Sequence, residues 1–401
     1  MSLISDRLNR ISPSQTIAIT DKARVLKAEG RDIISLSAGE PDFDTPENVK
    51  DAAIRAIREG QTKYTAVAGT QALRSAIAAR LAADFGTDYT ADEIVVSTGG
   101  KQSIFNAMVA TLNPGDEVII PTPAWVSYPD IVTLADGRPV LVPTDPAAGF
   151  KMTARQLADA ITPQTKWLML NSPCNPTGSA YTADELRSLC DVLLDHPHVW
   201  VFTDDIYAKL VYDGFVAQTV VQVEPKLRDR TVTMNGMSKA YAMTGWRVGY
   251  TAAPAALTRA MTKLQGQSTS NPCSIAQAAA CEAASGPQDF IAEMVETYRG
   301  RRDLVVAAIN AAPHLSCHVP QGAFYVFASM EKALGLTSAG GTKITSDEVF
   351  VTALLDETGV AAVHGTAFLC PGYFRISYAT DTETLREACR RVTAFCEGLH
   401  T

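Results

Sequence analysis

Short apolar runs and longer amphipathic stretches alternate through the first two thirds of the chain. Seven runs rich in β-branched and aromatic residues predict buried strands, at residues 94–97, 117–121, 140–142, 167–170, 200–203, 231–234 and 248–251. Between them, apolar positions spaced three and four residues apart predict helices at residues 46–58, 71–84, 101–112, 183–194 and 274–284. This alternation is typical of an α/β domain in which helices wrap a mostly parallel sheet.

The pattern changes after residue 286. A long charged helix is predicted over 289–312, then strands at 323–328 and 374–378 and a closing helix at 382–399, which together indicate a smaller α+β unit. Before it, a helical pattern at 19–29 and a Gly/Pro-rich loop at 38–46 form an N-terminal segment that could pack with this unit. We therefore expect an N-terminal arm with part of the small domain (1–45), a large domain (46–290) and a small C-terminal domain (291–401). Residues 338–343 are predicted to form an exposed loop.

Composition narrows the classes of function. The 401 residues include 35 Lys and Arg against 43 Asp and Glu, a net charge of −8, which argues against nucleic acid as a partner. No apolar run approaches the roughly 18–20 residues of a membrane span, and no secretory signal precedes the first helix. The eight cysteines include no C-x-x-C pair and no spacing typical of zinc ligands. We therefore expect no metal, reduced thiols and a cytoplasmic location.

The most informative segment is residues 235–250, NGMSKAYAMTGWRVGY. A lysine is usually a solvated surface amine, but Lys239 follows Ser238 and is surrounded by aromatic and small residues. A lysine in such a desolvated setting loses its proton more easily and becomes a Schiff-base nucleophile. Arg247 lies between two glycines eight residues later, and its guanidinium fork suits a phosphate dianion.

Five further segments support one interpretation. They are LSAGEPDF (36–43), KYTAVAG (63–69), NSPCNPTG (171–178), DDIY (204–207) and FRISYA (374–379). With the lysine segment, and in this order, they resemble the landmarks of fold type I, pyridoxal-phosphate-dependent aminotransferases of class I, and are similar in particular to those of bacterial aspartate aminotransferases. The resemblance implies the fold of that family, with a seven-stranded sheet in the large domain, and pyridoxal 5′-phosphate as the cofactor.

The resemblance also implies roles around the cofactor ring. Lys239 would be the covalent anchor and the general base. Asp204, directly after an apolar strand, would pair with the pyridine nitrogen, which must be protonated for the ring to act as an electron sink. Asp205 is the competing choice, and the spacing to Tyr207 in the family selects Asp204. Tyr207 and Asn175 would bind the phenolate oxygen.

Other residues are expected to hold the phosphate and the ring. Thr98-Gly99-Gly100 join a predicted strand to a helix, and backbone N–H groups at such a helix start bind anions. By resemblance, Ser238 and Arg247 complete this phosphate set, and Tyr64 reaches the phosphate of a neighbouring subunit, which implies a homodimer with shared sites. Trp125 would stack on the pyridine ring. The family usually has a tyrosine before this tryptophan, so we expect Ala124 to open space near the cofactor.

An amino acid substrate carries an α-carboxylate, for which an arginine is the natural partner. Arg375 matches that arginine in the family, with Gly39, Asn175 and Trp125 as helpers. One branch of the family uses an arginine of the partner subunit for the second carboxylate, but Gly266 occupies that position here. Another branch uses a lysine after the glycine-rich loop, which Lys101 matches. The alternative for Lys101 is an ordinary lysine in the first turn of a helix, where the helix dipole disfavours it.

The implied function is transfer of the amino group from an acidic L-amino acid, aspartate before others, to a 2-oxo acid such as 2-oxoglutarate or glyoxylate, by a ping-pong course. The alternatives are an aminotransferase for aromatic amino acids or prephenate, a lyase dependent on the same cofactor, and a ligand-sensing regulator with this fold. A regulator needs an N-terminal pair of DNA-binding helices, for which the chain leaves no room before the family match. A nicotinamide dehydrogenase is disfavoured because no G-x-G-x-x-G occurs.

Overall fold

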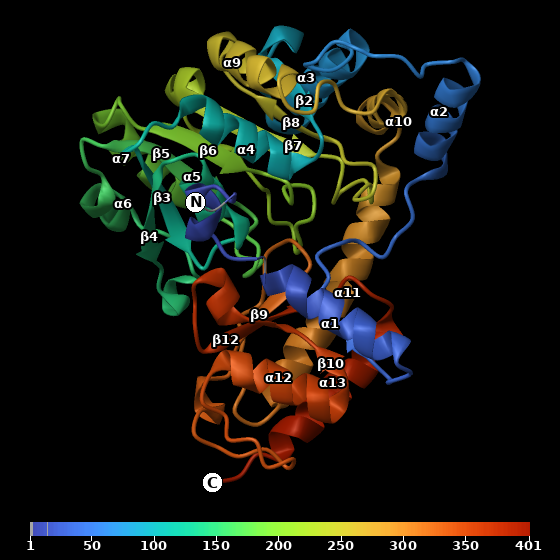
Figure 1. The fold of residues 1–401 in the computed structure, drawn as a ribbon, viewed down its shortest axis with the longest axis vertical. Coiled ribbons are helices and arrows are strands. Elements are labelled where there is room, and N and C mark those ends of the chain that lie inside the picture. Colours follow the sequence, from blue (N-terminus) through green and yellow to red (C-terminus); the bar gives the residue numbers. More distant parts are fainter. Residues whose placement is uncertain (1–2, 14) are drawn as a thin grey trace.

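The computed structural model describes residues 3–13 and 15–401 (Figure 1). Its centre is a seven-stranded sheet in the order β2-β8-β7-β6-β5-β3-β4. The strands are β2 (Ile94–Ser97), β3 (Glu117–Thr122), β4 (Arg138–Pro143), β5 (Thr165–Asn171), β6 (Trp200–Asp204), β7 (Thr231–Gly236) and β8 (Gly249–Ala252). Only β8 runs antiparallel to its neighbours. The prediction of a mostly parallel seven-stranded sheet is confirmed.

Helices cover both faces of this sheet, which explains why its strands read as continuous apolar runs. Alternate residues of one strand point to opposite faces. Val118 and Ile120 of β3 therefore join one cluster, with α4 (Gly100–Thr111), α5 (Ser127–Leu134) and α9 (Ala255–Gly266), while Ile119 joins another with α6 (Ala154–Ala160), α7 (Ala183–Asp195) and α8 (Val220–Val223). A third cluster under β2 and β8 holds α2 (Glu47–Arg58), α3 (Gln71–Phe85) and α10 (Ser274–Ser285).

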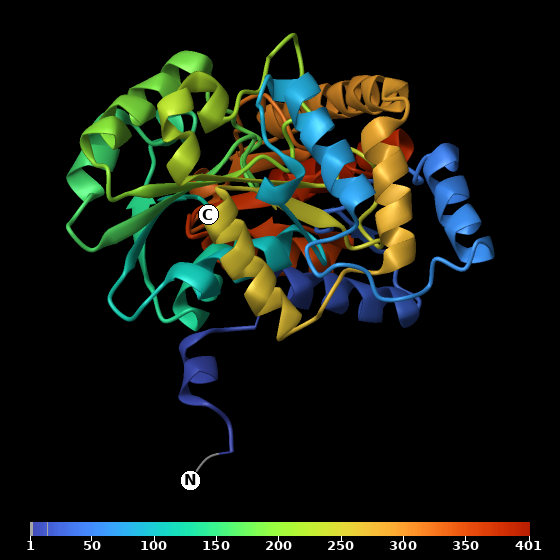
Figure 2. The ribbon, with the colours of Figure 1, turned by 90° about the horizontal axis from the view of Figure 1, so that it is seen from above.

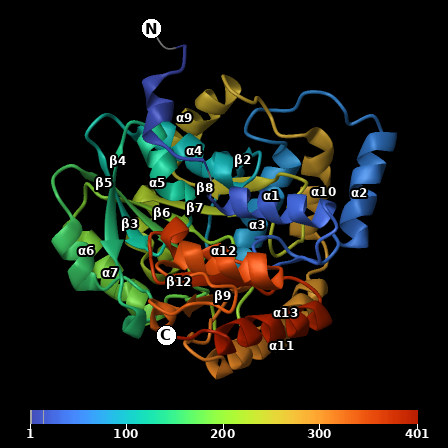
Figure 3. The ribbon, with the colours of Figure 1, turned by 60° about the horizontal axis from the view of Figure 1, so that its bottom comes forward.

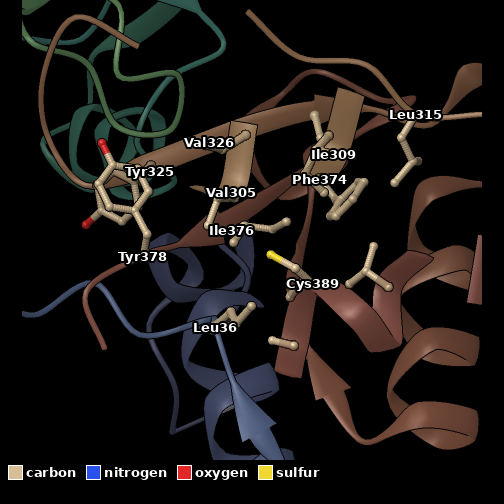
Figure 4. Close-up of a cluster of buried hydrophobic side chains, with 14 of the residues drawn as sticks. Leu36, Val305, Ile309, Leu315, Tyr325, Val326, Phe374, Ile376, Tyr378 and Cys389 are labelled. Carbon is tan, nitrogen blue, oxygen red and sulfur yellow. The ribbon is translucent and has the colours of Figure 1, made fainter. Parts of the chain in front are cut away.

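A long helix, α11 (Asp289–Ala311), leads from the large sheet into a smaller C-terminal unit (Figure 1). There, β9 (Tyr325–Ser329), β11 (Val363–His364) and β12 (Tyr373–Ser377) form an antiparallel sheet in the order β11-β12-β9. The helices α12 (Asp347–Thr358) and α13 (Thr382–Glu397) pack with this sheet around a large buried cluster (Figure 4). The prediction that this smaller unit has an α+β architecture is therefore confirmed.

The N-terminal segment packs against the C-terminal unit. Strand β1 (Ile34–Ser35) pairs in parallel with β10 (Val360–Ala361), and Leu36 belongs to the C-terminal cluster (Figure 4). Ala23 of α1 (Gln15–Ala28) shares a small cluster with Leu355 of α12, and the two helices run near each other in Figure 3. The short helix η1 (Asp6–Arg10) lies at the edge of the molecule in Figure 2 and contacts the large domain, where Arg7 and Arg10 form ion pairs with Asp136 after α5. The domain boundaries at residues 45 and 290 stay a prediction.

Some elements differ from the predictions. The strand expected at 323–328 begins at Tyr325, because Ala323 adopts a left-handed backbone conformation (φ 59°) that a strand does not accommodate. The loop expected to be exposed at 338–343 is exposed only from residue 339, since Ser338 is buried and donates a 2.5 Å hydrogen bond to Glu357. Within residues 3–13 and 15–401, no helix combines the length and the apolar character that crossing a membrane requires.

Candidate active site

A cavity of about 430 Å³ opens at the carboxyl ends of β5, β6 and β7, where open α/β sheets bind ligands. On its other side lie β9, β12 and the loop after β1. Eleven of the residues singled out from the sequence line it: Gly39, Gly100, Lys101, Trp125, Asn175, Asp204, Tyr207, Ser238, Lys239, Arg247 and Arg375. Segments distant in the sequence are thus brought to one site.

Lys239 lies in the loop after β7 with its amine inside the cavity. Its Nζ donates a hydrogen bond to the carbonyl oxygen of Gly39 and lies 5.9 Å from the ring centroid of Tyr207. Burial, and then the positive charge of Arg375, lower the pKa of the Lys239 amine to about 8. A sizeable fraction of this amine is therefore neutral near physiological pH, as a nucleophile or proton acceptor requires.

Asp204 ends β6 with its carboxylate in the same cavity. The hydroxyl of Tyr128 donates to its Oδ2 at 2.6 Å, and the backbone N–H of Ile206 donates to its Oδ1 at 3.2 Å. Burial nevertheless raises the pKa of this carboxyl to about 6. Asp205 does not line the cavity among the described residues, and it accepts a hydrogen bond from the hydroxyl of Thr203. The geometry therefore favours Asp204 over Asp205 as the group that meets a ligand.

Arg375 projects from β12 and is only 3% exposed. Its Nη1 donates to Asn175 Oδ1 at 2.9 Å and its Nη2 to the carbonyl of Ser37 at 2.6 Å, while its Nε has no partner. The guanidinium carbon lies 4.5 Å from the ring centroid of Tyr325 and 4.9 Å from that of Phe368. No carboxylate pairs with it in the part of the chain that the structure describes. A buried cation with a free donor and no counter-charge is suited to bind a carboxylate ligand.

The glycine-rich loop and Arg247 meet at the start of α4. Gly99 has a φ of 84°, and a Cβ atom there would overlap the Arg247 guanidinium, so both the backbone shape and the close approach require glycine. Gly99 itself does not appear among the described residues that line the cavity, although Gly100 and Ser238 do. Lys101 Nζ lies 4.8 Å over the Trp125 ring. Desolvation in the cavity, and then the charge of Arg247, lower the pKa of Lys101.

Two predicted positions lie elsewhere. Tyr64 is 92% exposed and lies outside the cavity as far as the described residues define it. Ala124 is 2% exposed and lines a separate cavity of about 20 Å³ together with Tyr128. The expectation that Ala124 opens space near the cofactor stays a prediction. Its side chain packs in the cluster under α5, its N–H donates to the carbonyl of Phe368 at 3.1 Å, and Tyr128 and Asn171 line both the small cavity and the larger one.

Sequence reasoning missed three residues of the site. Tyr128 contacts Asp204, and Tyr325 contacts Tyr207 through a 2.8 Å distance between hydroxyl oxygens. Asn171, at the end of β5, accepts from the N–H of Asn175 at 2.8 Å and donates to the carbonyl of Asp204 at 2.8 Å. A polar residue at the carboxyl end of a predicted buried strand was a usable signal for Asn171, whereas Tyr128 and Tyr325 read as core aromatics.

The sheet, the buried lysine and the carboxylate facing it define the class of the protein. The chain belongs to the class I and II aminotransferases, whose family profile matches residues 31–392. It is 59% identical to the aspartate/prephenate aminotransferase of Cereibacter sphaeroides, over 100% of both chains. It is 51% identical to the aspartate aminotransferase of Rhizobium meliloti, over 98% of this chain and 96% of that one.

Solved structures agree with this assignment. The crystal structure of the aspartate aminotransferase from Rhizobium meliloti superposes with a TM-score of 0.97 at 50% identity, over 100% of both chains. The aspartate aminotransferase of Thermus thermophilus with maleate superposes with a TM-score of 0.92 at 41% identity, over 98% of this chain and 100% of that one.

The enzyme is a pyridoxal-phosphate-dependent aminotransferase. The residues of the cavity fit this cofactor. Asp204 is buried with a raised pKa, and in the described residues it forms no ion pair with a cation, a partner that a protonated ring nitrogen would supply. The start of α4 with Arg247 and Ser238 forms a cationic end of the cavity suited to a phosphate. Lys239 lines the same cavity as both regions.

Proposed function

We propose that this aminotransferase takes the amino group of aspartate and passes it to a 2-oxo acid such as 2-oxoglutarate or glyoxylate. The observation that carries the proposal is that one cavity contains the reactive amine of Lys239 and two further cations, Arg375 and Lys101, that form no ion pair with a carboxylate in the described residues. A third cation of this cavity, Arg247, is the one we assign to the phosphate. A dicarboxylic amino acid brings one carboxylate for Arg375 and one for Lys101. The names of the relatives and the maleate, a dicarboxylate, in the Thermus thermophilus structure support this choice.

The cofactor, when bound, supplies an electron sink for the electrons of the substrate Cα–H bond. The chain's own residues would do the rest. Lys239 would anchor the cofactor covalently, and its neutral amine, once released, would take the Cα proton of the substrate. Asp204 would pair with the protonated ring nitrogen, and the Tyr128 hydroxyl, which donates to this carboxylate, would keep it ionised and oriented. Tyr207 and Asn175 would bind the phenolate oxygen.

The remaining residues position the ligands. Ser238, Arg247 and the backbone N–H groups of Gly99 and Gly100 would hold the phosphate. Trp125 would cover one face of the ring, since flat aromatic surfaces stack favourably.

Arg375, with Asn175 and the backbone of Gly39, would bind the α-carboxylate. Asn175 already contacts Arg375, so it links the carboxylate end of the site to the phenolate end.

Prephenate, itself a 2-oxo acid, is a second candidate acceptor of the amino group. The relative from Cereibacter sphaeroides carries both substrates in its name. Prephenate also has two carboxylates, so the same pair of cations suits it. Activity on prephenate is therefore compatible with the site that we propose for aspartate.

The test compares Lys101→Ala with a matched variant, Lys263→Ala, an exposed lysine on α9 outside the cavity in the described residues. We expect Lys101→Ala to raise the KM for aspartate about tenfold or more, the order of one charge-assisted hydrogen bond, and to change that for alanine about twofold or less. Lys263→Ala should leave both values unchanged. Equal losses for aspartate and alanine in Lys101→Ala would remove Lys101 from substrate recognition.

We also propose a homodimer with shared sites and a cytoplasmic location. In support of the dimer, Tyr64 has a large aromatic surface fully available to another subunit, as the family resemblance implies. In support of the location, all eight cysteines lie in the described residues and carry free thiols.

A further inference from the structure

Tyr325, at the start of β9, lies between two of the groups to which we assign roles. Its hydroxyl oxygen is 2.8 Å from that of Tyr207, and its ring centroid is 4.5 Å from the guanidinium carbon of Arg375. The side chain is fully buried apart from the face that lines the cavity. One residue thus contacts both the group assigned to the cofactor oxygen and the group assigned to the substrate carboxylate.

Gly39, in the N-terminal loop, packs closely against the hydroxyl of Tyr325. A Cβ atom on Gly39 would lie 2.9 Å from this hydroxyl oxygen, closer than real side chains pack. The carbonyl of Gly39 in turn accepts the hydrogen bond from Lys239. A larger residue at position 39 would push Tyr325 away from Tyr207, so glycine is required here for close packing.

The two tyrosines belong to different parts of the fold. Tyr207 follows β6 of the large sheet, whereas Tyr325 belongs to the small C-terminal sheet. In the register of β9 and β12, Tyr325 faces Ser377, two residues from Arg375, so Tyr325 and Arg375 are diagonal neighbours on one face. The hydroxyl pair therefore joins the small sheet to the large one at the cavity.

We propose that Tyr325 is a positioning residue that holds the Tyr207 hydroxyl and the Arg375 guanidinium in one geometry. This inference rests on the proposed function. The hydroxyl of Tyr325 and the ring of Tyr325 have separate effects. When the hydroxyl of Tyr325 donates to Tyr207, the proton of Tyr207 is free to point into the cavity. The ring of Tyr325, with that of Phe368, keeps the guanidinium of Arg375 between two aromatic faces.

The ionisable groups that face the tyrosine pair come from three elements. They are Arg375 on β12, Asp204 at the end of β6 and Lys239 after β7. Glu40, in the loop after β1, acts on Lys239 through its negative charge. Burial raises the pKa of Tyr207 and that of Tyr325, so both hydroxyls stay protonated at neutral pH. The two tyrosines therefore act through the direction of their O–H bonds, and not through a negative charge on either oxygen.

The experiment uses the cofactor-loaded enzyme and three variants, Tyr325→Phe, Tyr325→Leu and, as the matched control, Tyr378→Phe. Tyr378 is equally buried and belongs to the C-terminal cluster (Figure 4). Its hydroxyl donates to Tyr212 and to the carbonyl of Ala323, outside the cavity in the described residues. Each phenylalanine variant removes one buried hydroxyl. The measurements are the pH midpoint of the change in visible absorbance of the bound cofactor, and the KM for aspartate.

We expect Tyr325→Phe to move the absorbance midpoint upward by about half a pH unit to one unit, the size of one net hydrogen bond, with the KM nearly unchanged. A misaligned Tyr207 leaves more negative charge on the cofactor oxygen, which then holds the neighbouring proton more tightly. Tyr325→Leu should also raise the KM for aspartate about threefold to thirtyfold, because Arg375 loses an aromatic face. Tyr378→Phe should move neither value.

Two outcomes would overturn the proposal: an unchanged midpoint in Tyr325→Phe, or an equal shift in Tyr378→Phe, which would mean that any lost buried hydroxyl has this effect. Failure of the proposed function looks different. In that case the wild-type enzyme itself would lack the absorbance band or would not transfer the amino group of aspartate, whatever the variants do.

Discussion

Burial shifts each of the three ionisable side chains at the centre of the cavity away from its charged form. The pKa of Asp204 rises to about 6, that of Lys239 falls to about 8, and that of Arg375 is lowered as well. Each pKa shift arises because burial away from water raises the free energy of the charged form. A ligand that brings the opposite charge removes this cost, so the site is built to bind charged groups and to keep one amine neutral.

The lowered pKa of Lys239 predicts how the enzyme without cofactor takes it up. Only the neutral amine attacks the cofactor aldehyde, so the rate of covalent binding should rise about fivefold from pH 7 to 8 and about twofold more to pH 9. Stopped-flow absorbance on the apoenzyme measures this rate. The control, Lys239→Ala, should show no covalent absorbance band and no turnover. A rate that keeps rising tenfold per unit up to pH 10 would contradict the lowered pKa.

The contact between Tyr128 and Asp204 makes a second prediction. The hydrogen bond from the Tyr128 hydroxyl lowers the pKa of Asp204, so Tyr128→Phe should raise that pKa and weaken the pairing with the cofactor ring. A hydrogen bond to a charged group is worth about 1.5–3 kcal/mol, so the Kd for the cofactor should rise about tenfold to a hundredfold.

Equilibrium dialysis at pH 7.5 tests it. Tyr181→Phe is the control, because it also removes a buried hydroxyl, one that accepts from Met152 N–H outside the cavity in the described residues. An unchanged Kd in Tyr128→Phe would mean that the Tyr128 hydroxyl does not support the cofactor.

At the scale of elements, all seven predicted strands of the large sheet are present, and the reason is physical. Six of these strands are buried on both faces and form runs of apolar residues that are easily recognised. The edge strand β4 is partly exposed, but its apolar residues Val140, Leu141 and Val142 still form such a run. The helices α5, α6, α8, α9 and α12 were not predicted. Strands β1, β10 and β11 were not predicted either, because a strand of two residues contains no period to detect. Their positions depend on pairing partners far along the chain.

One helix start near the site provides a test at this scale. Helix α7 follows the NSPCNPTG loop, and Thr182 and Glu185 form a reciprocal capping box at its start. Thr182→Ala should lower the free energy of unfolding by about 1 kcal/mol. The control is Ser188→Ala within α7, where the hydroxyl bonds only the carbonyl of Asp184, and we expect a change of about 0.5 kcal/mol or less. Urea unfolding of both variants measures the difference, and equal effects would rule out the cap.

At the scale of the whole molecule, the proposed dimer predicts complementation between two defective chains. Tyr64→Ala lacks the side chain assigned to the partner's phosphate, and Lys239→Ala lacks the amine. In a mixed dimer, one site has the intact Lys239 of one chain and the intact Tyr64 of the other. A one-to-one mixture should therefore recover about a quarter of wild-type sites with normal cofactor affinity, since half the dimers are mixed and each has one good site.

Titration of the refolded or co-expressed mixture with cofactor measures those sites. Tyr207→Phe replaces Tyr64→Ala in the control mixture, because Tyr207 lines the cavity of its own chain. If Tyr64→Ala gives no more intact sites than that control, Tyr64 does not act across subunits.

The sequence by itself determined the alternation of strands and helices, and the segments around Lys239, Asp204 and Arg375, because burial and close backbone packing restrict residues locally. It did not decide which side chains meet. The contacts of Tyr128 and Tyr325, and the burial of Ala124, follow from the packing of β6, α5, β9 and β12. The same packing places the carboxylate of Asp204, which the family spacing had already favoured over Asp205, inside the cavity. Those elements are far apart in the chain, and only the folded arrangement brings their side chains within hydrogen-bond distance.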